Sequence, residues 1–116
     1  MIAQDDGNMI AQDDDDTIAQ DDDGDIIIAH RVLFVCLGNI CRSPTAQGVL
    51  EREAEKAGLT AAFSVDSAGV GGWHAGDPPD PRSQAVAAQH EVVLPGRARQ
   101  VRDDDFSRFD HLICMD

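Results

Sequence analysis

The chain has 116 residues, enough for one domain, and its formal net charge of −13 argues against nucleic acid as a partner. No apolar run approaches the roughly 18 residues that cross a bilayer, so we expect no membrane partner. The three cysteines do not form a recognisable disulfide framework, which favours a reducing, cytoplasmic setting.

The acidic residues are concentrated at the N-terminus. Residues 1–25 hold ten Asp and no Lys or Arg, and most of them belong to three near-copies of an octad, MIAQDDGN, MIAQDDDD and TIAQDDDG. Each copy offers one Ile-Ala pair for burial, too little to offset the entropy cost of ordering. We expect a disordered acidic tail over 1–25, neither a secretory signal nor a transit peptide, and a folded domain over 26–116. Metal chelation or docking by the Asp runs is the alternative.

The folded part opens with a strand and a helix. The segment DIIIAHRVLFVC is apolar and β-branched, as a buried parallel strand is, with its core at 32–36. A helix is expected over 43–57, with Ser43 as N-cap, Pro44 in the first turn and Gly58 at the end. Its apolar face should consist of Ala46, Val49, Leu50 and Ala54.

The remaining elements continue the alternation. A second strand starts at Phe63, a helix is expected over 82–90, a short helix begins at Asp103, and HLICM from 111 is a third strand. This order predicts a three-layer α/β fold, an open parallel sheet with helices on both faces. The third strand should lie near the edge of the sheet.

The loop between the first strand and helix suggests an anion-binding site. Ligands of open α/β sheets bind beyond the carboxyl ends of the strands, where a helix N-terminus presents N–H groups and a positive dipole. Gly38 accepts a positive φ and Asn39 tolerates one. The guanidinium of Arg42 matches two oxygens of a phosphate. Residues 37–43 could therefore hold a tetrahedral dianion.

Cys36 would lie beneath that loop. The same N–H groups and Arg42 would lower the pKa of its thiol and make it a nucleophile, and the Ser43 hydroxyl could bond to the sulfur. The alternative is a buried structural cysteine followed by a salt-bridged arginine. A zinc site at Cys36, Cys41 and Cys114 is disfavoured because Cys-x4-Cys is not a usual spacing, and we expect Cys114 to pack in the core instead. We expect no metal or organic cofactor, and no histidine in a clear acid/base pair.

The segment VLFVCLGNICRSP resembles the signature of the low-molecular-weight protein tyrosine phosphatases, and VDSAG, W, DPR, ARQV, DF and CMD extend the similarity over about 32–116. The resemblance implies a Rossmann-like phosphatase fold. It also implies hydrolysis of phosphotyrosine proteins or small aryl phosphates through a phosphocysteine, with inorganic phosphate as product and inhibitor.

By the same resemblance, Cys36 is the nucleophile, Arg42 binds the phosphoryl oxygens and Ser43 assists the thiolate. Asn39 holds the loop in shape with Ser67 as a partner. The other implied binding residues are the slot walls Leu37 and Trp73, the loop residues Gly38 and Ile40, and Cys41, which can form a reversible disulfide with Cys36.

The resemblance has a gap. The family's general acid is an Asp in an Asp-Pro pair near its C-terminus, whereas Asp77-Pro78 and Asp80-Pro81 lie in an earlier loop. We expect the last strand and helix of the fold to be missing and activity to be reduced, since a general acid contributes about 10²–10⁴-fold. The alternatives are an arsenate reductase of the same fold, with Cys114 as an extra thiol, and a catalytically weak phosphate-binding module.

Overall fold

Three parallel strands form the centre of the molecule. The computed structural model describes residues 29–115, so the acidic tail predicted over 1–25 lies outside the described residues. The elements in chain order are β1 (His30–Cys36), α1 (Arg42–Lys56), a 3-10 turn η1 (Thr60–Ala62), β2 (Phe63–Gly69), α2 (Pro81–Gln89), α3 (Asp105–Arg108) and β3 (His111–Cys114).

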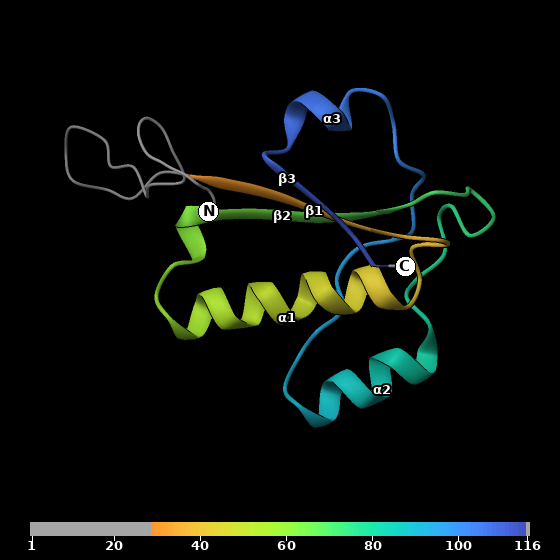
Figure 1. Ribbon diagram of the computed structural model, residues 1–116. Coiled ribbons are helices and arrows are strands. Elements are labelled where there is room, and N and C mark those ends of the chain that lie inside the picture. Colours follow the sequence, from red (N-terminus) through yellow and green to blue (C-terminus); the bar gives the residue numbers. More distant parts are fainter. Residues whose placement is uncertain (1–28, 116) are drawn as a thin grey trace.

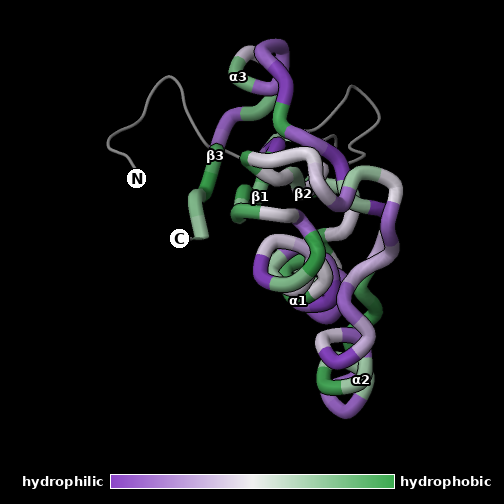
Figure 2. Tube along the Cα trace, turned by 90° about the vertical axis from the view of Figure 1, so that its right-hand side faces the viewer, coloured by the Kyte–Doolittle hydropathy of each residue, from purple (hydrophilic) through white to green (hydrophobic). Residues whose placement is uncertain are grey.

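The strand order is β2-β1-β3, and β1 is parallel to both neighbours. α1 runs along one face of this sheet and α3 lies on the opposite side, while α2 packs beyond α1, away from the strands (Figures 1 and 2). The apolar core is a cluster of Leu33, Val35 and Ala68, extended by Val101, Phe109 and Leu112. The predicted open parallel α/β sheet is confirmed, with β3 at one edge of the described sheet.

The buried face of α1 agrees with the predicted one only at Ala54. The helix buries small and polar residues, Ser43, Pro44, Gln47, Gly48 and Ala54. Val49 is 43% exposed, and Ala46 and Leu50 are only half-buried beside an open cavity that Phe34 and Met115 also line. Small side chains face the packed side because a Cβ on Gly48 would lie 2.7 Å from the carbonyl oxygen of Val93.

Three local predictions need correction. Ser43 is not the N-cap of α1: the helix begins at Arg42, and Ser43 lies inside its first turn, where its hydroxyl contacts the Cys36 sulfur instead. α3 begins at Asp105 rather than Asp103, because the Asp105 carboxylate is buried and accepts the backbone N–H of Arg102. Cys114, expected in the core, is exposed on the edge strand. The predicted stop at Gly58 is confirmed by its φ of 73°.

Candidate active site

The loop that follows β1 lies at the carboxyl edge of the sheet, between the end of β2 and the first turn of α1. Asn39 adopts the left-handed conformation with φ 58°, whereas Gly38 has no positive φ, so only the expectation for Asn39 is confirmed. Gly38 is needed for space instead, since the His74 ring lies 3.0 Å from where its Cβ would be. Gly69 serves the same purpose on the other side, where a Cβ would meet the Gly38 carbonyl carbon at 3.0 Å.

The Cys36 thiol is enclosed by hydrogen-bond donors. Its side chain is 2% exposed, its Sγ lies 3.0 Å from Ser43 Oγ, and the backbone N–H of Asn39 donates to the sulfur at 3.2 Å. Burial by itself raises the pKa of Cys36, but the Ser43 hydroxyl and the N–H groups of Ser43, Asn39 and Gly38 outweigh it. The pKa of Cys36 therefore lies below its ordinary value, which favours the thiolate.

The Asn39 side chain joins the loop to the sheet and to α1. It is 3% exposed, and its Nδ2 donates to Ser43 Oγ at 2.8 Å and to Ser67 Oγ at 3.0 Å. Its Oδ1 accepts the backbone N–H of Arg99 at 2.9 Å, and Ser67 Oγ donates to Gln47 Oε1 at 2.7 Å. Because Ser43 Oγ accepts from Asn39, its own proton is available to the Cys36 sulfur.

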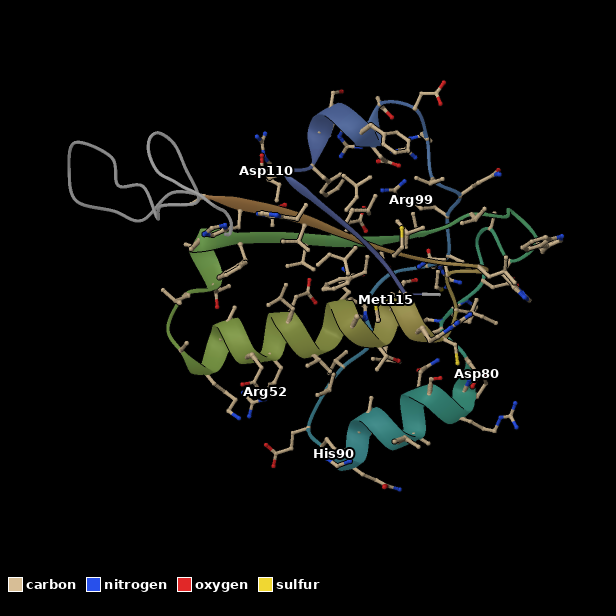
Figure 3. The ribbon with its side chains drawn as sticks, viewed as in Figure 1. Arg52, Asp80, His90, Arg99, Asp110 and Met115 are labelled. Carbon is tan, nitrogen blue, oxygen red and sulfur yellow. The ribbon has the colours of Figure 1, made fainter. Side chains whose placement is uncertain are left out.

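The other predicted loop residues are arranged around this network. Leu37 and Trp73, the predicted slot walls, are 51% and 70% exposed. Arg42 is exposed and its Nη1 lies 3.4 Å from the carbonyl oxygen of Met115. Met115, labelled in Figure 3, follows β3. The carbonyl oxygen of Ile40 accepts the N–H of Asp80 at 2.8 Å.

The two loop cysteines face different surroundings. Cys41 is exposed with its Sγ 3.0 Å from Ser83 Oγ on α2, whereas Cys36 is buried, and both are free thiols. The geometry thus brings Cys36, Ser43 and Asn39 together without Cys41. The disulfide between the cysteines remains a prediction, one that would require Cys41 to leave Ser83.

Two site residues were missed by sequence reasoning. Gln47 and Arg99 complete the hydrogen bonds of Ser67 and Asn39; Arg99 lies in the ARQV stretch, which showed similarity but suggested no role. The expectation that no histidine has an acid/base partner was wrong, since His74 Nδ1 lies 3.2 Å from Asp77 Oδ2. Only the spacing His-x-x-Asp could have signalled that pair.

Neither a metal-binding cluster nor a membrane-spanning helix is present over residues 29–115. Within that range, no group of three or more His, Cys, Asp or Glu side chains is placed to hold a metal ion. Over the same residues, none of the helices has the length and apolar character required to cross a membrane.

Comparison with known sequences connects this site to a family. A family model described as low molecular weight phosphotyrosine protein phosphatase matches residues 31–116. The low molecular weight phosphotyrosine protein phosphatase of Schizosaccharomyces pombe is 49% identical over 87 residues, which cover 74% of this chain and 56% of the relative. The human protein of that name is 44% identical over 85 residues, 73% of this chain and 54% of its own. The chain spans about half the length of the curated relatives it matches.

Solved structures show the same fold. YfkJ from Bacillus subtilis superposes with a TM-score of 0.73 at 46% identity, covering 78% of this chain and 56% of YfkJ. DARP, a drosophila arginine phosphatase, gives a TM-score of 0.70 at 39% identity over 73% of this chain and 54% of DARP. Both superpositions cover most of the described residues.

Proposed function

This chain belongs to the low molecular weight phosphotyrosine protein phosphatase family, and on that premise we propose that it hydrolyses phosphotyrosine and aryl phosphate monoesters. The observation that carries the proposal is the state of Cys36. Its sulfur is buried, lies 3.0 Å from Ser43 Oγ, and has a pKa below the ordinary value. A thiolate held at the carboxyl edge of a parallel sheet, beside a helix N-terminus, is placed to attack a bound phosphorus atom.

The reaction would proceed in two displacements. The Cys36 thiolate attacks phosphorus, the S–P bond forms, and the P–O bond to the phenol breaks with its electron pair leaving on oxygen. Water then attacks phosphorus, the S–P bond breaks, and inorganic phosphate and the thiolate are released. The N–H groups of 37–43 and the guanidinium of Arg42 would stabilise the equatorial oxygens. Ser43 would donate a hydrogen bond to the departing sulfur and so stabilise it as the thiolate.

The groups that donate hydrogen bonds to the Cys36 sulfur limit which leaving groups this site can expel quickly. The Ser43 hydroxyl and the backbone N–H groups that contact Cys36 are neutral and poor acids. They can stabilise the thiolate but do not readily protonate an expelled phenoxide. We therefore propose that turnover by this chain depends strongly on the acidity of the phenol, and that phosphotyrosine is cleaved slowly.

The test is a series of aryl phosphates that spans phenol acidity, with phosphotyrosine at the slow end. Rates should rise as the phenol becomes more acidic, and Cys36→Ser should reduce kcat by about 10³-fold or more, because the nucleophile is lost. Cys114→Ser is the matched control, since that thiol is exposed on β3, and it should retain activity. Undiminished hydrolysis by Cys36→Ser would refute the mechanism.

Two other oxyanion reactions follow from specific observations. DARP is described as an arginine phosphatase, so phosphoarginine belongs in the substrate series. Cys114 is exposed and its Cα pairs with Val35, the neighbour of Cys36, which keeps the arsenate reductase alternative open. Arsenate-dependent thiol oxidation that Cys114→Ser abolishes would support it. Phosphate binding without any turnover would favour the phosphate-binding module instead.

The proposed partners and location follow the same reading. Phosphotyrosine proteins or small aryl phosphates are the proposed substrates, and inorganic phosphate the product and competitive inhibitor. The described cysteines are all free thiols, which fits the reducing, cytoplasmic setting proposed from the composition.

A further inference from the structure

The left-handed conformation of Asn39 needs support from outside the loop. A side chain disfavours positive φ, so such a residue keeps its conformation only when its surroundings determine it. The side-chain Nδ2 of Asn39 donates to Ser43 and Ser67, which lie within the site already described. Its Oδ1, however, accepts the backbone N–H of Arg99, 60 positions further along the chain. The position of that N–H therefore helps to set the loop.

The backbone of Arg99 is paired with the end of β2. Gly69 N–H donates to the Arg99 carbonyl oxygen at 2.8 Å, and Val101 N–H donates to the Gly69 carbonyl oxygen at 2.8 Å. This is a short extension of the sheet, with Gly69 bridged to Gln100. A single isolated bridge holds the Arg99 backbone only loosely, so the Arg99 side chain is needed to fix the position of the Arg99 N–H.

The guanidinium of Arg99 is clamped between two carboxylates. Its Nε and Nη2 donate to Asp66 Oδ2 at 3.2 and 3.0 Å, and its Nη1 and Nη2 donate to Asp105 Oδ2 and Oδ1 at 2.9 and 3.0 Å. Figure 3 shows Arg99 between α3 and the strands. The two-atom contact with Asp105 restricts both the position and the tilt of the planar group.

Both carboxylates are themselves anchored. Asp105 is fully buried and also accepts the N–H of Arg102 at 2.7 Å, which ties the clamp to α3. Asp66 lies on β2, and its Oδ1 accepts the N–H of Ser67 at 2.8 Å. Asp66 thus contacts the two residues, Arg99 and Ser67, that hold Asn39 from two sides.

We propose that the Arg99 side chain, held by Asp66 and Asp105, is a positioning residue that keeps Asn39 and the oxyanion-binding loop in their active geometry. The inference rests on the proposed function, because it assigns Arg99 to the same reaction. Arg99 acts through its backbone N–H and through Asn39, whose own N–H and side chain then place donors on Cys36 and Ser43.

The experiment compares Arg99→Lys with Arg31→Lys. Lysine keeps the charge but cannot donate to both carboxylates as a fork. Arg31 is the matched control because its Nε and Nη2 make the other forked contact, with Asp110 Oδ2 and Oδ1 at 3.3 and 3.1 Å, at the far end of β1 from Cys36. Both variants are made in the full chain with Cys41→Ser and Cys114→Ser, so that Cys36 is the remaining thiol.

Two quantities are read: the pH midpoint of iodoacetamide alkylation, and the phosphate concentration that protects the thiol. Arg99→Lys should move the midpoint upward, toward the ordinary value near 8.5, and weaken phosphate protection roughly tenfold. Arg31→Lys should leave both unchanged, although either variant can lower the melting temperature. An unchanged midpoint and unchanged protection in Arg99→Lys would overturn the proposal and leave Arg99 a purely structural residue.

Two further readouts keep the outcomes distinct. If Arg99→Lys does not fold, Asp66→Asn takes its place, since it weakens the half-exposed arm of the clamp and should shift the midpoint in the same direction. An unshifted midpoint in a folded Asp66→Asn would likewise overturn the proposal. Absence of turnover in the parent chain would refute the proposed function alone, because alkylation and phosphate protection do not require turnover.

Discussion

At the scale of single residues, Asn39 determines the shape of the loop over residues 37–43. Its φ of 58° costs on the order of 1 kcal/mol for a residue with a side chain. Hydrogen bonds to Ser43, Ser67 and Arg99 offset that cost, since each contributes about 0.5–1.5 kcal/mol. The resulting conformation directs the Asn39 N–H at the Cys36 sulfur, so one residue sets both the backbone and the thiol environment.

Replacing Asn39 should therefore impair the site whichever small residue takes its place. Asn39→Ala leaves the buried Ser43 and Ser67 hydroxyls without a donor, a loss of about 1–3 kcal/mol, and kcat/KM for an activated aryl phosphate should fall roughly 10- to 100-fold. Asn39→Gly is the matched variant, because it relieves the backbone strain yet also lacks the amide. We expect a comparable fall in steady-state kinetics. Wild-type activity in Asn39→Gly would show that backbone conformation alone matters.

At the scale of elements, α1 carries the loop against the sheet through small residues. Gly48 lies against the segment after α2, where its missing side chain makes room for the Val93 carbonyl and the Val92 and Leu94 side chains. One residue later, Val49 is half-exposed at the open cavity beside β3. Two adjacent positions of one helix therefore have opposite tolerance for a change in size.

This contrast predicts the effect of substitutions on stability. Gly48→Ala places a Cβ 2.7 Å from the Val93 carbonyl oxygen, and the forced shift should lower the free energy of unfolding by about 1–3 kcal/mol, despite the better helix propensity of alanine. Val49→Ala, its neighbour, should change that free energy by less than about 1 kcal/mol. Urea unfolding followed by circular dichroism measures both, and equal losses would show that the Gly48 contact is not tight.

On the scale of the whole molecule, two arginines connect the last third of the described chain to the sheet. Arg99 binds Asp105 of α3 and also Asp66 of β2, and Arg31 of β1 binds Asp110 immediately before β3. Hydrogen bonds from Arg99 lower the pKa of Asp105 below its usual range despite burial. Burial raises the pKa of Asp110, but the hydrogen bonds from Arg31 outweigh it and the net direction is also downward.

Because of these two carboxylates, the free energy of unfolding should decrease at acidic pH. Their folded pKa values lie below the unfolded value of about 3.9, so the folded state binds fewer protons in that range and stability rises with pH. The contribution is complete above about pH 4 and is lost as pH falls through the lower, folded pKa values. Urea midpoints measured from pH 6 to pH 2 should show this fall.

The Asp105 part of this dependence can be isolated. Asp105→Asn should flatten the pH profile and lower stability at pH 6 by about 3–5 kcal/mol, because it leaves a partly buried Arg99 without its main counter-charge. Asp103→Asn, exposed on the preceding turn, should keep the wild-type profile. A profile for Asp105→Asn parallel to that of the wild type would contradict the assignment.

The sequence alone was sufficient for the strand–loop–helix unit that carries the candidate site. An apolar, β-branched run, a Cys-x5-Arg loop with Gly and Asn, and a Pro-containing first turn are local patterns, so β1, α1 and the neighbourhood of Cys36 and Ser43 follow from neighbours in the chain. The same holds for β2, α2 and β3, whose periodicity and Gly or Pro boundaries mark them individually.

Only the tertiary structure decided which distant residues complete the site and which helix face is buried. Asn39 meets Arg99 because the segment between α2 and α3 pairs with the end of β2, next to β1. The contact of Asn39 with Ser67, which the resemblance implied, forms because β2 lies beside β1. The face of α1 around Val49, apolar by its spacing, remains half-exposed because the packed side requires the small volume of Gly48. Such contacts depend on strand order and packing distances, and periodicity within one segment carries no information about either.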